Sequence, residues 1–208
     1  DDRLQLLLKS KLKDNLFASL NNDFKHVDQV ENIICFDISH LSGSNTQGSC
    51  VWFTKYGPQK NLYRRYNVTD IKQSDDYGAI KFVMRKRLKK LKDEGSLPEL
   101  IVVDGGKGQI TQAKLVLQEL NILNLMVLGI VKGHKRNTDN DRILDINFND
   151  ITLTLSKNTI ITIQKMRDEA HRFAIIGQRH KSNKKQYNSR LDSVPGIGKI
   201  KKIELLKY

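Results

Sequence analysis

The sequence predicts an α/β fold built on a mixed five-stranded sheet flanked by helices. Five segments have the apolar, β-favouring character of strands, and they cover residues 33–39, 48–55, 61–67, 99–104 and 125–131. The first three follow one another closely, and Gly57 with Pro58 supplies a hairpin turn between the second and the third. The last two alternate with segments of helical periodicity. Hairpin-connected strands followed by this alternation are typical of a sheet with an antiparallel half and a parallel half.

Apolar periodicity predicts the helices. They lie at about residues 1–28, 75–94, 105–120 and 159–176, and a small hairpin over 143–147 and 151–155 precedes the last of them. This order of elements is that of a ribonuclease H-like fold, in which the first strand is central and neighbours the fourth. In such a sheet Asp37, within the first strand, and Asp104, at the end of the fourth, are expected to lie side by side.

Composition indicates a globular protein with a polyanionic partner. The chain has 208 residues, of which 38% are hydrophobic and only three are proline. No apolar run approaches the roughly 18 residues that span a bilayer, and no signal-like leader is present. The formal net charge of +13 exceeds what solubility requires, so nucleic acid is the favoured partner and a membrane surface is not.

Two clusters carry much of this charge. Residues 81–92 predict a basic face on a helix, and residues 179–190 predict a basic linker. The alternative is that both are ordinary solvated surface. Cys35 and Cys50 lie in strand-like segments and are expected to be buried free thiols, which indicates a reducing, cytoplasmic location. The chain begins at Asp1 without methionine, so a fragment or a processed form is expected.

Asp37 is unexpected in an apolar strand, because an ionised carboxylate in a dry interior is costly unless it is paired or bound to a metal. Asp104 ends another apolar strand before the turn "GGKGQ", at the strand end where α/β sheets place their sites. Two buried aspartates brought together would repel unless a cation lies between them. A Mg²⁺ or Mn²⁺ site is therefore predicted. Lys107, in that turn, contacts a phosphate or is merely solvated.

Several separated motifs then indicate a family. The stretches "CFDISH", "GSCVWF", "YRRYNV", "DDYGAI", "LPELIVVDGGKGQ" and "MRDEAHRFA", in this order, closely resemble the C-terminal half of UvrC proteins, the incision subunits of bacterial nucleotide excision repair. The resemblance runs from Glu31 to Ile175 and resumes in "LDSVPGIGKIKKIELLKY". It implies a ribonuclease H-like, metal-dependent endonuclease domain that makes the 5′ incision beside a DNA lesion. It also implies damaged double-stranded DNA and the UvrB–DNA complex as partners, the latter through parts of the full-length protein absent here.

The family's catalytic residues map onto Asp37, Asp104 and His171, and a further aspartate maps onto Asp76. Asp37, Asp104 and His171 would hold the metal, or His171 would serve proton transfer. Two alternatives remain open from the residues themselves. Asp76 lies where a helix N-cap is expected, and His171 lies late in an amphipathic helix, where a structural histidine is common.

The "VPGIG" turn resembles the hairpin of a helix-hairpin-helix element, whose backbone N–H groups can hold a DNA phosphate. The expected organisation is a helical segment over 1–28, the endonuclease domain over 29–178, the linker over 179–190 and the first half of a helix-hairpin-helix region over 191–208. The residues expected to bind DNA are Lys107, Arg179, Lys181, Lys184, Lys185, Gly196 and Gly198. The alternative function is a catalytically silent module of the same fold that binds DNA or docks a partner.

Overall fold

The computed structural model describes residues 17–24, 29–40, 46–68, 75–133 and 141–192, together with positions 198, 201 and 204. The chain divides into two compact units, Asp1–Ala174 and Ile175–Tyr208. The first unit contains the sheet and the predicted site. Among the described residues, no helix is both long enough and apolar enough to cross a membrane.

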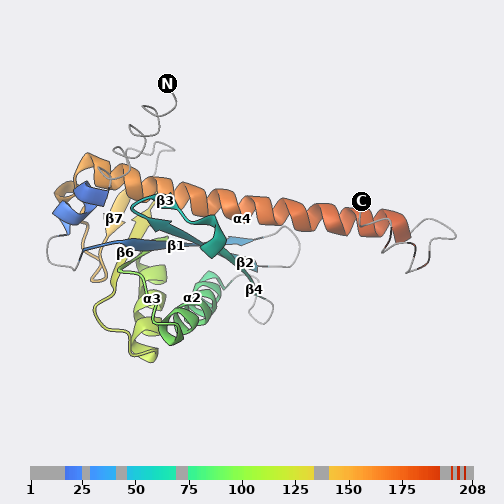
Figure 1. Cartoon of the computed structure of the whole chain (residues 1–208), viewed down its shortest axis with the longest axis horizontal. Coiled ribbons are helices and arrows are strands. Elements are labelled where there is room, and N and C mark those ends of the chain that lie inside the picture. Colours follow the sequence, from blue (N-terminus) through green and yellow to red (C-terminus); the bar gives the residue numbers. More distant parts are fainter. Residues whose placement is uncertain are drawn as a thin grey trace, which may run out of the picture. The chain divides into compact units, whose positions relative to one another are not determined.

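The sheet has seven strands in its described part: β1 (Asn32–His40), β2 (Thr46–Thr54), β3 (Gly57–Pro58), β4 (Arg64–Val68), β5 (Leu100–Asp104), β6 (Met126–Val131) and β7 (Arg142–Leu144). Their order is β3-β2-β1-β5-β6-β7, and β4 also pairs with β2 (Figure 1). The strand β1 is antiparallel to β2 and parallel to β5, and β5 is parallel to β6. The predicted mixed sheet, with its first strand central beside the strand of Asp104, is confirmed.

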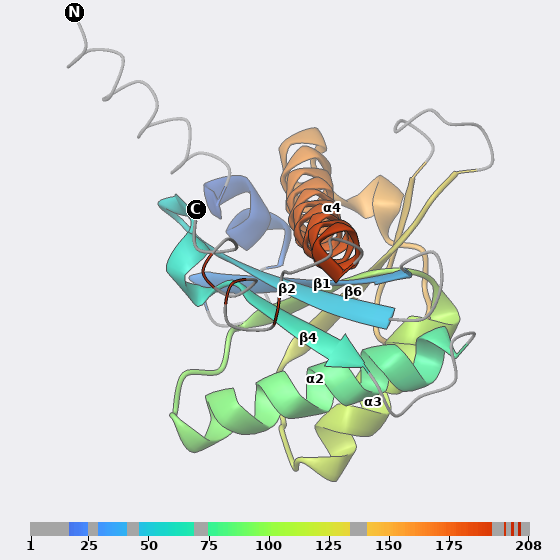
Figure 2. The same ribbon diagram turned by 90° about the vertical axis from the view of Figure 1, so that its right-hand side faces the viewer.

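Helices cover both faces of this sheet. The helices α2 (Asp76–Asp93) and α3 (Lys107–Glu119) lie on one face, and the first part of α4 (Lys157–Asp192) lies on the other (Figure 2). Because both faces are covered, the central strands carry continuous apolar runs, and residues 33–36 and 100–103 are fully buried. Cys35 and Cys50 are buried free thiols, as expected.

The helix α2 forms where the sequence predicts it. The Asp75 side chain accepts a hydrogen bond from the Gly78 N–H at 2.7 Å and so caps the first turn. The predicted apolar face is buried, with Ile80, Val83, Met84, Leu88 and Leu91 all in the core. The cations of residues 81–92 therefore lie mainly on the outer side of this helix, although Arg87 is buried.

Three expectations about secondary structure are wrong. The sheet has more strands than the five expected: β3 is only two residues long, and β7, which coincides with the first half of the predicted small hairpin, joins the same sheet by pairing with β6. The second half of the predicted small hairpin is a 3-10 helix, η3 (Thr152–Thr154). There the Asp150 side chain accepts hydrogen bonds from the N–H and hydroxyl of Thr152, which favours a local turn.

The third wrong expectation is that the last helix ends near Ile176. The helix α4 instead continues to Asp192 through the expected basic linker. Residues 178–192 contain no glycine or proline and include several lysines and arginines, which have good helix propensity. The predicted helix-hairpin-helix turn, including Gly196, falls largely outside the described residues. Of that turn only Gly198 is described, and it is exposed.

Candidate metal centre

Three elements bring Asp37, Asp104 and His171 together. Each of these residues offers one ligand atom, and the three atoms all lie within 4.8 Å of one another. Asp37 comes from β1 and Asp104 from the end of β5. Because Phe36 pairs with Val103, the two aspartates follow at the same level of adjacent parallel strands. His171 comes from α4, which packs across this face of the sheet (Figure 2).

Asp37 is the buried member of this group, with only 4% of its surface exposed. Its Oδ2 atom has no hydrogen-bond partner within the described part of the chain. Burial, and then the charge of Asp104, raise the pKa of the Asp37 carboxyl to about 6. A deprotonated Asp37 is therefore destabilised at neutral pH, and a bound cation would relieve that cost.

Asp104 has a cationic neighbour that the sequence did not lead us to name. The Lys132 ammonium lies 3.5 Å from Asp104 Oδ2, and the lysine side chain is 65% exposed. Lys132 follows β6, whose carboxyl end lies beside that of β5. Polar residues that follow parallel strands gather at one edge of the sheet, and this principle pointed to Asp104 in the sequence. The same principle could have pointed to Lys132.

His171 faces Asp37 from α4. Its Nδ1 atom lies 3.9 Å from Asp37 Oδ2, and 54% of the histidine side chain is exposed. One turn earlier on the same helix, the buried Arg167 guanidinium forms an ion pair with Asp141, just before β7. Asp141 also accepts a hydrogen bond from the Gly133 N–H at 3.4 Å, so the pair connects α4 to the residue after Lys132.

The turn between Asp104 and α3 leads into a helix start whose first backbone N–H groups have no side-chain cap from the N-cap residue. Gly106 is the N-cap residue and provides no side-chain cap. A Cβ at Gly105 would lie 2.4 Å from the end of the Gln109 side chain, so that side chain packs closely on the turn. Lys107, the first residue of α3, is exposed. The free N–H groups of such a helix start are suited to a phosphate oxygen.

Asp76 lies in the first turn of α2. The N-cap role that we considered for Asp76 is taken by Asp75. Asp76 does not belong to the group of three possible ligands found within the described residues. Its neighbour Tyr77 packs on the start of α3, because a Cβ at Gly108 would meet the Tyr77 ring at 2.3 Å. Asp76 thus lies on the helix whose start contacts the first turn of α3, and its catalytic role stays a prediction.

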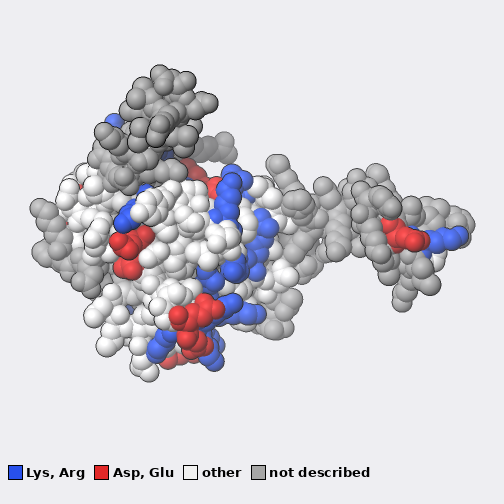
Figure 3. All heavy atoms as spheres, in the orientation of Figure 1, with Lys and Arg blue, Asp and Glu red and all other residues white. Residues whose placement is uncertain are grey.

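The expected DNA-binding cations of α4 have side chains outside the described residues. Arg179, Lys181, Lys184 and Lys185 lie on the helical backbone of α4, but their side chains are outside the described part. Figure 3 shows lysine and arginine side chains gathered on the face in view, in the region where Figure 1 shows β2, β3 and β4. The chain from β2 to β4 includes four cations: Lys55, Lys60, Arg64 and Arg65.

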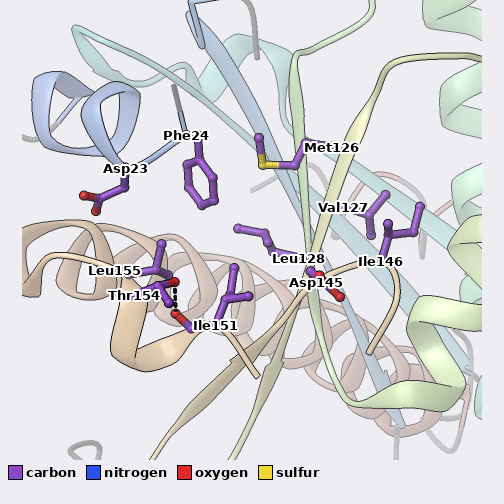
Figure 4. A pocket seen from close by; sticks show the side chains of 10 residues that line it. All are labelled: Asp23, Phe24, Met126, Val127, Leu128, Asp145, Ile146, Ile151, Thr154 and Leu155. Carbon is purple, nitrogen blue, oxygen red and sulfur yellow. Dashed lines mark hydrogen bonds between the residues drawn. The ribbon is translucent and has the colours of Figure 1, made fainter. Parts of the chain in front are cut away.

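A separate hollow of about 290 Å³ lies at the other end of the parallel strands. Apolar side chains from the start of β6 and from residues 151–155 line it, together with Asp23 and Asp145 (Figure 4). Both carboxylates accept backbone hydrogen bonds: Asp23 accepts one from the Ser156 N–H, and Asp145 accepts one from the Asn147 N–H. Since Asp104 pairs with Ile130 near the opposite end of β6, this hollow is not part of the metal centre.

The donor set fits a hard divalent cation. Two carboxylate oxygens and an imidazole nitrogen converge, and Asp37 Oδ2 is buried without another partner among the described residues. Mg²⁺ and Mn²⁺ prefer oxygen ligands, and Mn²⁺ also accepts imidazole. The arrangement can therefore hold a cation beside the start of α3.

Comparison with known proteins gives a consistent result. Residues 21–175 match a family model described as the UvrC RNAse H endonuclease domain. Curated relatives carry the name UvrABC system protein C: the protein from Saccharophagus degradans is 42% identical over 92% of this chain, and that from Xanthomonas campestris is 37% identical over 87%. These matches cover 32% and 29% of the relatives, so the chain spans about a third of their length.

Solved structures show weaker likeness. Endonuclease V from Ciona intestinalis, in complex with DNA containing an inosine, has 16% identity over 65% of this chain and 60% of that chain, with a TM-score of 0.41. The C-terminal lobe of a budding yeast Argonaute has 14% identity over 66% of this chain and 31% of that chain, with a TM-score of 0.36. Likenesses at this level carry no information on chemistry.

Proposed function

Because the chain belongs to the UvrC RNase H endonuclease domain family, we propose that it is a divalent-metal-dependent DNA endonuclease. It hydrolyses a phosphodiester bond on the 5′ side of a lesion during bacterial nucleotide excision repair. The observation that carries this proposal is the convergence of Asp37, Asp104 and His171 from three separate elements. A catalytically silent module would have no need to keep a buried carboxylate such as Asp37 without a partner.

The roles follow from the positions of the side chains. Asp37 and Asp104 provide negative charge for Mg²⁺ or Mn²⁺, and His171 completes the ligand set or moves a proton at Nδ1. When bound, the ion would supply Lewis acidity and an activated water for phosphodiester hydrolysis. The free N–H groups at the start of α3, together with exposed Lys107, would hold a phosphate of the scissile strand.

The substrate and partners are proposed from the relatives' shared name and from charge. A net charge of +13 favours damaged duplex DNA, bound through its phosphates and without sequence preference. The basic residues of α4, Gly196 and Gly198 would add contacts to the DNA backbone. Docking on the UvrB–DNA complex would use parts of the full-length protein outside this chain, and the protein would act in the cytoplasm.

Nicking of a supercoiled plasmid with added MnCl₂ tests this function. We expect nicking that EDTA stops, and we expect Asp104→Asn and His171→Ala to lower its rate by about a hundredfold or more, because each removes a ligand or proton carrier. Asp93→Asn, at the exposed end of α2, and Lys165→Ala, exposed on α4, are the matched controls and should nick normally. Normal nicking by Asp104→Asn would contradict the assignment.

Lys132 should affect metal binding and nicking in opposite directions. Its ammonium competes with a cation for Asp104, so Lys132→Met should tighten Mn²⁺ binding by about threefold, given the modest energies of exposed charge pairs. Once a metal ion replaces the Lys132 ammonium at Asp104, that ammonium is free to face a substrate phosphate. Lys132→Met lacks this positive charge, so it should nick more slowly at saturating Mn²⁺. Mn²⁺ titration by calorimetry and single-turnover nicking measure the two effects, with Lys165→Met as the control. Weaker Mn²⁺ binding in Lys132→Met would contradict this role.

A further inference from the structure

We propose that Ser49 and Arg65 are positioning residues of the metal centre, which hold α4 so that His171 faces Asp37. This inference rests on the proposed function, because it concerns how the same site is assembled. Neither residue belongs to the group of Asp37, Asp104 and His171. Both instead bind backbone carbonyls of α4 on either side of His171.

The sheet places Ser49 and Arg65 in one row with Asp37. Asp37 on β1 pairs with Ser49 on β2, and Ser49 pairs with Arg65 on β4. Directly paired residues of adjacent strands point to the same face of a sheet. The row therefore presents a carboxylate, a hydroxyl and a guanidinium, in that order, to the face that α4 covers (Figure 2).

Ser49 makes the inner of the two contacts. Its side chain is fully buried, and its hydroxyl donates a hydrogen bond of 3.1 Å to the carbonyl oxygen of Ala170. Ala170 immediately precedes His171 and is itself fully buried. A serine beside Asp37 in the sheet is thus bonded to the residue beside His171 in the helix. This bond couples the positions of the two ligands.

Arg65 makes the outer contact. Its Nε and one terminal nitrogen donate to the carbonyl oxygen of Phe173 at 3.2 and 2.7 Å. Its guanidinium also lies over the Phe173 ring, 3.7 Å from the ring centre. Tyr63 packs edge-on against the same ring with centroids 5.0 Å apart, and its hydroxyl donates to Glu169 at 3.1 Å. The helix is therefore fixed on both sides of His171.

The contacts from Ser49 and Arg65 to α4 are not needed to satisfy the backbone carbonyls of the helix. Within a helix, the carbonyls of Ala170 and Phe173 already accept from the N–H groups four residues later. The contacts from Ser49 and Arg65 are additional, so they add little to the helix itself and instead fix its rotation and translation on the sheet. A small shift of α4 would move the 3.9 Å spacing between His171 Nδ1 and Asp37 Oδ2. Metal binding is sensitive to such supporting contacts, whose loss typically weakens affinity or activity by 10–100-fold.

The test compares Ser49→Ala, Arg65→Met and the double variant with the unmodified chain, in the absence of DNA. Mn²⁺ is titrated into protein carrying isotope-labelled histidine, and paramagnetic broadening of the His171 signals, assigned with His171→Ala, reports the imidazole beside the metal. We expect the double variant to need about tenfold more Mn²⁺ for half-maximal broadening. The single variants should show smaller shifts and should fold, since each removes contacts to carbonyls that keep their helical partners.

Thr162→Val is the matched control on the same helix. The buried Thr162 hydroxyl donates to the Asn158 carbonyl within α4, so this variant loses a buried hydroxyl bond without losing a contact to the sheet. It should leave the Mn²⁺ titration unchanged. If Arg65 instead acted only by contacting DNA, Arg65→Met would weaken DNA binding and leave the DNA-free titration unchanged, which would overturn its part of the proposal.

The outcomes separate this inference from the proposed function. If the unmodified chain binds Mn²⁺ beside His171 and nicks DNA, but the three variants match it, the positioning role is wrong and the nuclease assignment stands. If the unmodified chain shows neither broadening of His171 nor Mn²⁺-dependent nicking, both are wrong. A raised Mn²⁺ requirement in Ser49→Ala and Arg65→Met, with normal circular dichroism spectra and an unaffected Thr162→Val, supports the inference.

Discussion

Asp37→Asn is expected to abolish Mn²⁺-dependent nicking while making the metal-free protein relatively more stable at alkaline pH. The loss of activity follows from the proposed role of Asp37 as a buried metal ligand, and several kcal/mol of transition-state stabilisation correspond to about a thousandfold in rate. The gain in stability follows from removing a buried carboxylate. Asp37 is only 4% exposed, and its Oδ2 atom has no hydrogen-bond partner among the described residues.

The pH dependence of this stability difference has a defined sign. Folding raises the pKa of Asp37 from 3.8 to about 6, mainly through burial. Below about pH 4 the carboxyl is protonated in both states and costs nothing. Between about pH 4 and pH 6 the unfolded state loses the proton first, so the free energy of unfolding falls as the pH rises. Above about pH 6 the whole cost is present, about 3 kcal/mol.

Urea unfolding of both proteins in EDTA, at about pH 4 and about pH 8, measures this effect. The stability of Asp37→Asn relative to the unmodified chain should rise by about 2–3 kcal/mol between the two pH values, and comparing pH values cancels the packing cost of the amide. Asp93→Asn, on the exposed surface, should show no such rise. Unchanged relative stability would mean that Asp37 ionises normally in the folded protein. Added Mn²⁺ should stabilise the unmodified chain at pH 8 and leave Asp37→Asn unaffected.

Arg167→Leu is expected to cause the largest loss of stability, about 3–5 kcal/mol, because it leaves the Asp141 carboxylate buried without its cation. The Arg167 and Asp141 side chains are only 7% and 5% exposed. Arg85→Leu is the matched control, since Arg85 pairs with Glu119 at 2.7 Å but both side chains are more than 40% exposed. That surface pair should be worth less than about 1 kcal/mol.

Chemical unfolding of a double variant identifies the cause of the loss. Replacing both partners, with Arg167→Met and Asp141→Leu, should cost less than Arg167→Leu alone, because no isolated charge then remains buried. If the double variant is as unstable as the single one, packing around Arg167 rather than its charge maintains the fold. The pair also joins α4 to Gly133, so its loss should reduce nicking along with stability.

The amino-acid sequence by itself determined most of the architecture. The apolar, β-favouring runs at 33–36 and 100–103 predicted strands of the sheet, and the structure confirms strands that are fully buried there. The apolar face of α2 and an N-cap at its start could be predicted because local periodicity and capping chemistry act within a few residues, although the cap is Asp75 and not Asp76. Asp37 was conspicuous because a carboxylate contradicts its apolar surroundings.

Other features were decided only by the tertiary structure, because they depend on contacts between residues distant in the chain. No local pattern marks Ser49, whose bond to Ala170 spans 121 residues, or Arg65, whose bond to Phe173 spans 108. Nor could the sequence show that Arg167 pairs with Asp141 in the interior. Sheet register and helix docking set these distances, and both are determined by packing of the whole core. The sequence thus marked the aspartates, whereas the packing of α4 on the sheet decided how closely His171 approaches them.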